Sequence, residues 1–465
     1  MKIFISYPPL EGKGTPLLGQ NRQFQWFSKP SFIYPMVPAS AATLLRKHGH
    51  DVFWDDAIAK QWTYDKWWNN LLKEKPDLIA IETKTPVIKQ HWKIVNEIKK
   101  ALPNTKVVLM GDHVTALPDE TLEKCDGVGI IDGGDYDFAL LPPSLGFQND
   151  NGLSFDLNKL PMICRDLTQW QLYGERLYKH GPFTYTMAGR DCQWGKCTFC
   201  SWTTLYPTFN VCSPEKLLDE IAWLIEKYGI REIFDDTGTF PAGRWTEEFC
   251  LGMIKRGLNK QVKISCNMRF DSLRVDRLRL MKAAGFRLFK LGLESANQKT
   301  LDRLNKGMIV DYIASACRIA KRIGFDLHLT IMVGYPWETR ADVLKTYELA
   351  KHLMESGFVD MLQATIVIPY PGTPLYEEAL KNDWFIIDPT DYEKFDMSQP
   401  VLRTPDMSPA EVVEMCNSFY RLFLKPKFIW RYLRNIRSRN DVKFIANGAK
   451  AVIGHLTDFG RKEGL

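Results

Sequence analysis

Short apolar segments alternate with helical segments along most of the chain, and this alternation limits the possible folds more than any other sequence feature. In the N-terminal part, each strand-like segment is followed by a helical one, and the strands are predicted in KIFISYPP, DVFWDDA, DLIAIET, KVVLMGDH and GVGIIDGG. Strands that alternate with helices indicate a parallel, doubly wound sheet with helices on both faces. We therefore predict an α/β domain over residues 1–142.

A second strand–helix series follows a segment rich in proline and aspartate, residues 143–182, which we interpret as a linker. Its strands are predicted in FTYTMAGRD, IREIFDDTG, VKISCNMRF, FRLFKLGLES, DLHLTIMVGYP and DMLQATIVIPYPG. Six such units in a row predict a partial (β/α)6 barrel over residues 183–390, with its chemistry at the carboxyl ends of the strands. Residues 391–465 are predicted to form a C-terminal helical extension.

Composition narrows the class of protein. The chain has 465 residues, 45% hydrophobic and 25% charged, which is enough for two or three domains with sizeable cores. The N-terminus, MKIFISYPPL, does not read as a signal peptide, and no apolar run is long enough to cross a bilayer. A cytoplasmic location is expected, where ten cysteines are not expected to form a disulfide framework.

Three of the ten cysteines cluster directly after the first predicted barrel strand. Cys192, Cys197 and Cys200 lie within nine residues, in AGRDCQWGKCTFCSW. Three thiolates can hold a metal centre that keeps one position open, whereas a structural zinc site uses four ligands and a cubane [4Fe–4S] cluster is usually held by four cysteines. Cys212 lies close downstream and could complete a four-cysteine zinc site. The spacing alone therefore leaves an iron–sulfur cluster and a zinc site as alternatives.

The segment CQWGKCTFC resembles the cluster motif of the radical S-adenosylmethionine (SAM) enzymes. Its final Cys-x-aromatic-Cys, with Phe199, matches that motif, but four residues separate the first two cysteines where the family has three. Gly195 can absorb the additional residue in the loop. The resemblance implies that Cys192, Cys197 and Cys200 bind a [4Fe–4S] cluster whose remaining iron chelates SAM. It also implies that one-electron reduction cleaves SAM to methionine and a 5′-deoxyadenosyl radical.

Segments at the ends of later barrel strands resemble the SAM-binding motifs of the same family. They are FDDTGTF, CNMRF, KLGLESANQKTL and IMVGYPWET, and the resemblance covers residues 183–379. It implies SAM contacts at the ends of successive strands: Phe199 in the cysteine loop, Asp235, Asp236 and Gly238 after the second strand, Asn267 and Arg269 after the third, Glu294 after the fourth and Gly334 after the fifth.

A doubly wound domain in front of such a barrel resembles the cobalamin-binding domain of one radical SAM subclass. Classical cobalamin proteins supply a histidine from an Asp-x-His-x-x-Gly loop after the first strand, and YPPLEGKG contains no histidine. The subclass commonly lacks that ligand, so the resemblance still implies cobalamin. A domain that has kept only a packing role is the alternative. The candidate lining lies at three strand ends: Thr83, Lys84 and Thr85, then His113, then Gly133, Gly134 and Asp135.

The resemblance implies hydrogen abstraction from an unactivated carbon and, in this subclass, most often methyl transfer. We predict a cobalamin-dependent C-methyltransferase or carbon–carbon bond-forming enzyme, with a small hydrophobic substrate such as a lipid, an isoprenoid or another secondary metabolite, and a reductase as electron donor. One alternative is a radical SAM enzyme with a degenerate cobalamin domain and non-methylating chemistry. The other is a zinc-stabilised, non-catalytic binding protein.

The C-terminal extension mixes large apolar side chains with basic ones, in KPKFIWRYLRNIRSR. Between Arg421 and Lys450, nine Lys and Arg residues stand against one acid, Asp441. Such a stretch could lie on an anionic membrane surface, and it resembles the tails of lipid-pathway members of the subclass. The alternative is a helix packed on the barrel by its apolar residues. Nucleic acid is not expected as a partner, since no RNA-binding module accompanies the stretch.

Overall fold

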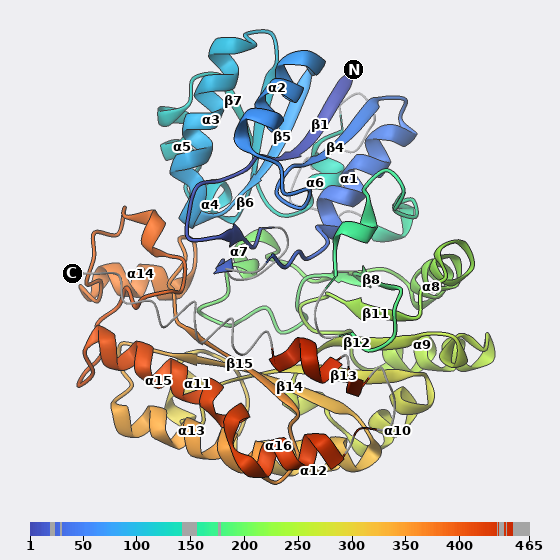
Figure 1. Cartoon of the computed structure of the whole chain (residues 1–465), viewed down its shortest axis with the longest axis vertical. Coiled ribbons are helices and arrows are strands. Elements are labelled where there is room, and N and C mark those ends of the chain that lie inside the picture. The colour runs from blue at the N-terminus through green and yellow to red at the C-terminus, as the bar shows by residue number, and fades with distance from the viewer. Residues whose placement is uncertain are drawn as a thin grey trace.

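The computed structural model describes residues 1–18, 24–27, 30–141, 156–174, 178–434, 436, 441–442 and 444–449. Its N-terminal part contains a five-stranded parallel sheet with the order β4-β1-β5-β6-β7, and helices lie on both sides of it (Figure 1). This sheet confirms the predicted doubly wound domain. Its strands are β1 (Lys2–Tyr7), β4 (Asp51–Asp56), β5 (Leu78–Thr83), β6 (Lys106–Gly111) and β7 (Val128–Ile131).

The helices of the N-terminal domain follow its strands as the periodicity predicts. The first helix is almost entirely buried, and the second exposes one polar face and begins at a Thr63 side chain that accepts the Lys66 amide. The helices are α1 (Met36–Lys47), α2 (Tyr64–Glu74), α3 (Ile88–Ala101), α4 (Asp112–Ala116), α5 (Pro118–Lys124) and α6 (Tyr136–Ala139). Of the predicted linker, residues 143–155 and 175–177 lie outside the described residues.

The second large sheet has six parallel strands in simple sequence order, β8 to β15, and confirms the predicted partial barrel. Its edge strands are β8 and β15, so the barrel is open. The strands are β8 (Phe183–Thr186), β11 (Glu232–Asp235), β12 (Lys263–Met268), β13 (Phe286–Glu294), β14 (Asp326–Val333) and β15 (Met361–Ile366). Between them lie α8 (Pro214–Tyr228), α9 (Arg244–Lys255), α10 (Val275–Ala283), α11 (Gln298–Arg303), α12 (Ile313–Ile323) and α13 (Arg340–Glu355).

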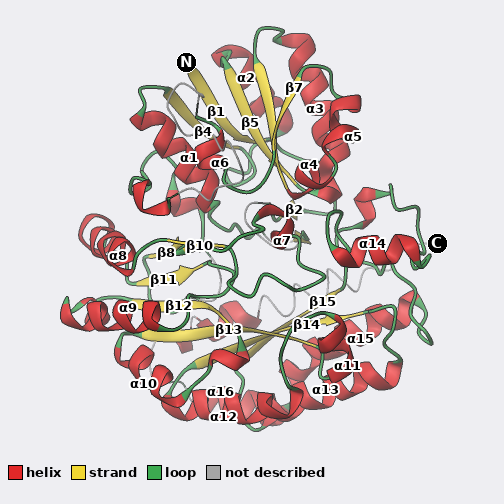
Figure 2. Cartoon of the chain, turned by 180° about the vertical axis from the view of Figure 1, so that it is seen from behind, coloured by secondary structure: helices red, strands yellow, loops and turns green. Residues whose placement is uncertain are grey.

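The N-terminal sheet and the barrel sheet pack against each other. The short helix α7 (Trp202–Leu205), which follows the cysteine loop, lies between the N-terminal sheet and the barrel sheet in both views (Figure 1 and Figure 2). One buried apolar cluster joins Ile79 of β5 to Tyr335 after β14. The carboxyl ends of the N-terminal strands therefore meet the part of the barrel that carries the cysteines.

The C-terminal part does not begin as a helical extension. After α14 (Pro374–Lys381), residues 384–402 return to the N-terminal domain, where the Tyr392 hydroxyl donates to Glu120 at 2.8 Å. Two helices follow, α15 (Pro409–Arg421) and α16 (Pro426–Arg434), and α15 begins with the capping box of Ser408 and Glu411. Among the described residues, no helix has both the length and the apolar character needed to span a membrane.

Candidate active site

The cysteine loop leaves β8 at the carboxyl edge of the barrel. Cys192, Cys197 and Cys200 form no disulfide within the described residues, and their side chains are partly exposed. Gly195, in the longer gap between the first two cysteines, has a φ of 54°, a left-handed conformation that favours glycine. The loop is tied to the barrel through Thr198, whose amide donates to the carbonyl of Leu304 at 3.1 Å. The additional residue is thus accommodated without separating the loop from the barrel.

Aromatic and cationic side chains surround the loop. The Trp194 indole donates to the carbonyl of Asn305 at 2.7 Å, and the Arg269 guanidinium lies 4.3 Å from the Trp194 ring centroid. The Lys306 ammonium lies 5.7 Å from the Phe199 ring centroid. Burial raises the pKa of the Cys197 thiol, and Lys306 opposes that shift. The positive charges of Lys306 and Arg269 therefore lie close enough to the cysteine loop to favour the thiolate form of its cysteines.

Glu294 forms a buried ion pair that the sequence analysis missed. It ends β13 with a φ of 60°, and its Oε1 lies 2.8 Å from the Lys306 ammonium. Burial works against the ammonium charge, but Glu294 and Cys197 outweigh it and raise the pKa of Lys306. A Cβ on Gly292 would lie 2.3 Å from Glu294 Oε1, so a larger residue there would displace the charged ends of the pair. The pair joins the predicted SAM contact to the cysteine loop, and no local motif identified Lys306.

The residues at the carboxyl end of β11 contact the segment that leads into the cysteine loop. The buried Asp235 carboxylate accepts hydrogen bonds from the Thr186 hydroxyl at 2.8 Å and the Ala188 amide at 3.1 Å, and burial raises the pKa of Asp235. A Cβ on Gly238 would lie 1.9 Å from the carboxylate of Asp191, next to Cys192. Asp235 and Gly238 therefore fix the segment from Thr186 to Asp191, which leads into Cys192. Asp236 follows them, with its amide bonded to the carbonyl of Thr186 at 2.8 Å.

The remaining predicted SAM contacts fall at neighbouring strand ends. The side-chain amide of Asn267 donates to the carbonyl of Thr237 at 2.9 Å. The Arg269 guanidinium donates to the carbonyl of Lys306 at 2.7 Å. Gly334 has a φ of 92°, and a Cβ there would lie 3.0 Å from Val412 of α15. Asn267 and Arg269 thus join the strand ends next to the cysteine loop, whereas Gly334 also makes room for the C-terminal helix.

The environment of the three thiols suits an iron–sulfur cluster. Among the described residues, no three Cys, His, Asp or Glu side chains are arranged to hold one metal ion. A cubane cluster takes each of its cysteine ligands on a different iron. Cys212 is buried in the apolar core, and burial raises the pKa of this thiol to about 12. Three half-buried thiols with cations beside them therefore fit a [4Fe–4S] cluster with an open iron.

The candidate residues after β5 and β6 are bonded to the domain itself. The Thr83 hydroxyl lies 2.6 Å from His91 Nδ1, and the Lys84 ammonium lies 3.2 Å from the Asp112 carboxylate. The Thr85 hydroxyl lies 3.3 Å from the ring of His113, which packs edge-on against Tyr392 with ring centroids 4.7 Å apart. Asp112 Oδ1 is buried and has no hydrogen-bond partner among the described residues. This edge therefore holds a polar atom that a ligand could satisfy.

The turn after β7 contacts the cysteine loop directly. The Arg190 guanidinium, two residues before Cys192, lies 2.9 Å from the Asp137 carboxylate and 3.3 Å from that of Asp135. The Tyr206 hydroxyl donates to the carbonyl of Gly134 at 3.0 Å, and a Cβ on Gly134 would lie 2.3 Å from the Tyr206 ring. The candidates Gly133 to Asp135 thus form the contact between the two domains.

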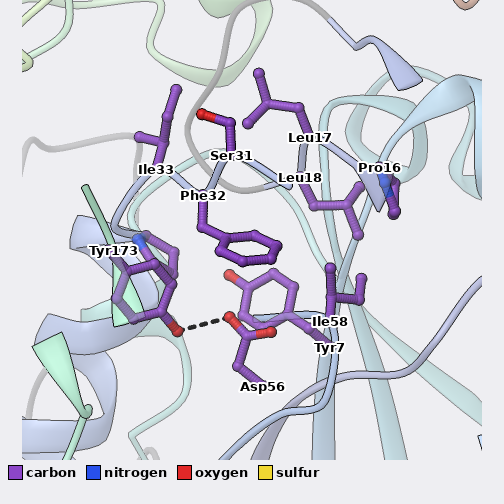
Figure 3. A pocket seen from close by; sticks show the side chains of 11 residues that line it. Tyr7, Pro16, Leu17, Leu18, Ser31, Phe32, Ile33, Asp56, Ile58 and Tyr173 are labelled. Atoms are coloured by element: carbon purple, nitrogen blue, oxygen red, sulfur yellow. Dashed lines mark hydrogen bonds between the residues drawn. The ribbon is translucent and has the colours of Figure 1, made fainter. Parts of the chain in front are cut away.

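A pocket lies at the carboxyl ends of β1 and β4, on the opposite side of the N-terminal sheet from β7 (Figure 3). The Tyr173 hydroxyl donates to the Asp56 carboxylate at 2.6 Å on its wall. The other lining residues are mostly apolar or aromatic: Tyr7, Pro16, Leu17, Leu18, Ser31, Phe32, Ile33, Pro35 and Ile58. Tyr7 and Asp56 lie in the predicted strand segments KIFISYPP and DVFWDDA, but the pocket could not be predicted from sequence, because segments far apart in the chain line it. None of the residues predicted to line a cobalamin site, Thr83 to Thr85, His113 and Gly133 to Asp135, belongs to this pocket.

Comparisons with known proteins match both halves of the chain. Residues 188–350 match the model of the radical SAM superfamily, and residues 31–140 match that of the B12 binding domain. An uncharacterised methyltransferase of Pyrococcus horikoshii is 26% identical over 92% of this chain and 94% of its own. An anaerobic magnesium-protoporphyrin IX monomethyl ester cyclase of Cereibacter sphaeroides is 26% identical over 93% of this chain and 72% of its own.

The fold also has a solved counterpart. The radical SAM methyltransferase TsrM from Kitasatospora setae, solved with cobalamin and a [4Fe–4S] cluster, aligns with a TM-score of 0.68 at 12% identity. The alignment covers 98% of this chain and 99% of that chain. The similarity therefore extends over the N-terminal sheet and the barrel together.

Proposed function

Because the chain belongs to the radical SAM superfamily and carries a B12-binding domain before its radical SAM domain, we propose that it is a cobalamin-dependent C-methyltransferase. The ion pairs of Arg190 with Asp135 and Asp137 carry this proposal. They hold the edge of the B12-binding domain against the loop that bears Cys192. A methyl group carried on one domain would then be close to the carbon activated on the other.

Each group of residues has a task in this scheme. Cys192, Cys197 and Cys200 would hold the cluster, which together with SAM supplies a radical able to abstract hydrogen from an unactivated carbon. The cations Lys306 and Arg269 favour thiolate ligands by their charge, as neighbouring Lys and Arg do for other cysteines. The aromatic and apolar side chains around them exclude water, which a radical reaction requires of its site.

The substrate class follows from the same surroundings. Aromatic walls favour a small hydrophobic molecule, which a lipid, an isoprenoid or another secondary metabolite would satisfy. The Cereibacter relative is named for a cyclase of a magnesium porphyrin ester, and this favours ring formation as the second candidate reaction. In either case the cluster needs an electron, which we assign to a reductase partner.

Metal analysis of anaerobically purified protein tests the proposal. Protein from cells supplied with cobalamin should contain about four irons per chain, as a cubane requires, and one cobalt, with broad visible absorption. SAM with a deuterated methyl group should then label the product. Iron without cobalt would leave the N-terminal domain as a scaffold and contradict cobalamin-dependent methyl transfer. A colourless, zinc-containing protein would contradict the radical chemistry altogether.

Replacing Glu294 with glutamine should weaken SAM binding while leaving the cluster in place. We expect the Kd for SAM to rise roughly 10- to 100-fold, since a hydrogen bond to a charged group contributes about 1.5–3 kcal/mol. Titration calorimetry on cluster-loaded protein measures this effect. The matched control is Glu232→Gln, which alters a buried pair with Arg287. An unchanged Kd in Glu294→Gln would remove Glu294 from the SAM site.

Helix α16 has one face on the barrel and one in solvent. Its Tyr432 hydroxyl donates to the carbonyl of Asp360 at 2.6 Å, and Phe428 is buried. On the outer face, Ile429, Trp430 and Leu433 are exposed beside basic residues. We propose that this outer face of α16 makes a peripheral contact between a cytoplasmic enzyme and an anionic membrane. The basic residues Arg437 and Arg439 lie outside the described residues.

Vesicle sedimentation tests this contact. The protein should sediment with phosphatidylserine-containing vesicles at low salt, and less with pure phosphatidylcholine or at high salt, because the attraction is partly electrostatic. The Trp430→Ala/Leu433→Ala variant should lose roughly tenfold in binding through its smaller apolar surface. Equal binding of this variant, or no binding of the wild type, would contradict a membrane role of the outer face.

A further inference from the structure

A tyrosine after β14 stands in the wall of the proposed SAM site. The strand ends at Val333, and after Gly334 the chain places the Tyr335 side chain fully inside the protein. The ring stacks on Trp337 with centroids 5.3 Å apart and planes 20° apart. Trp337 is itself fixed, since its indole donates to the Thr300 hydroxyl at 3.2 Å. The Tyr335 ring is therefore held in one place.

The hydroxyl group of Tyr335 has no hydrogen-bond partner among the described residues. Two other buried tyrosines show the usual arrangement: the Tyr420 hydroxyl donates to the carbonyl of Ala364 at 2.7 Å, and that of Tyr7 donates to Glu82 at 2.5 Å. A buried hydroxyl without a partner loses its bonds to water and gains nothing in exchange. Such a group is expected to meet its partner in a ligand.

The position of the hydroxyl identifies which ligand. The turn of Tyr335 is anchored beside Glu294, because the Ser295 hydroxyl donates to Glu338 at 2.6 Å and the Glu338 amide donates to the carbonyl of Tyr335 at 3.1 Å. Burial raises the pKa of Tyr335, and Glu294, Glu338 and Cys197 raise it further. Phe199 of the cysteine loop packs against the same buried apolar cluster that contains Tyr335. The phenol is thus a neutral donor near that loop, on a turn anchored beside Glu294.

We propose that Tyr335 binds SAM, by donating a hydrogen bond to an oxygen or nitrogen acceptor of the cofactor. The inference rests on the proposed radical SAM function and adds the side chain of Tyr335, which lies in the segment IMVGYPWET but was not among the predicted SAM contacts. It also accounts for the burial of a hydroxyl that the described chain leaves unsatisfied.

The Tyr335→Phe variant tests this assignment in the full chain with its cluster loaded. The Kd for SAM, measured by titration calorimetry, should rise roughly fivefold to tenfold, as expected for one neutral hydrogen bond. The thermal midpoint of the SAM-free protein should stay the same or rise, because the variant removes an unsatisfied group. Tyr420→Phe is the matched control. It removes a satisfied bond outside the site, so it should lower the midpoint and keep the Kd.

The outcomes separate this inference from the proposed function. If the wild type with a loaded cluster does not bind SAM, the proposed function fails. If the wild type binds SAM and Tyr335→Phe binds it equally well, the assignment of Tyr335 fails alone. An equal Kd with a shifted midpoint potential of the cluster also overturns the assignment, since it would mean that the phenol bonds to a cluster sulfur.

Discussion

Alanine at any one of Cys192, Cys197 and Cys200 is expected to abolish reductive SAM cleavage. A cubane held by three thiolates has no spare protein ligand, so the loss of one leaves two and the cluster is not retained. Each variant should lose most of its iron and its visible absorption, and 5′-deoxyadenosine formation should fall below detection. Anaerobic reconstitution followed by iron analysis and product assay measures both effects.

Two other cysteines provide the control for this experiment. Cys212 lies nearby in sequence but is buried in the apolar core, and Cys317 is buried in α12. Alanine at either position should retain iron and SAM cleavage, with only a modest loss of stability from the smaller side chain. Loss of the cluster in Cys212→Ala would mean that the metal site has four cysteines and has been misidentified.

The second large effect is expected from Asp137→Ala, which breaks the ion pair between the domains. Asp137 is fully buried and Arg190 nearly so, with 2.9 Å between their charged groups. Removing one partner of a buried pair leaves an uncompensated charge and costs about 3–5 kcal/mol. Urea unfolding of the ligand-free protein should show a loss of this size.

A double variant and a surface pair make this result interpretable. Asp137→Leu combined with Arg190→Met removes both charges and should recover much of the lost stability. Glu248→Ala, in the exposed pair of Glu248 with Arg244, should change stability by less than about 1 kcal/mol. If Asp137→Ala is as stable as the wild type, the contact between the domains does not depend on this pair.

Local patterns were sufficient to predict both sheets and the cysteine loop. A strand buried on both faces, such as β5, begins with a continuous apolar run, here LIAI. The capping box at Ser408, where α15 begins, is likewise a local sequence signature. The spacing of the three cysteines is also local, and the glycine in the longer gap indicated how the loop would adapt. These features need no knowledge of which distant segments meet.

The contacts that complete the site depend on tertiary structure. Lys306 meets Glu294 across a helix, and Arg190 meets Asp137 53 residues away in the chain. The apolar pattern placed Thr83 at the end of a predicted strand, but the sequence could not tell whether its side chain contacts a ligand or, as observed, His91. The sequence also could not show that residues 384–402 contact the N-terminal domain, because the hydrogen bond between Tyr392 and Glu120 depends on tertiary packing.

Residues 384–402 contact the N-terminal domain, and this contact limits how that domain can be exchanged with the corresponding domain of a relative. In this segment, the Tyr392 hydroxyl donates a hydrogen bond to Glu120. Asp396 forms an ion pair with Lys13, in the first loop of the chain. A chimera cut between the B12-binding and radical SAM domains would therefore split two interfaces, one of them encoded after the barrel. A chimera with a foreign N-terminal domain therefore also needs segment 384–402 from the same donor, and the two regions have to be exchanged together.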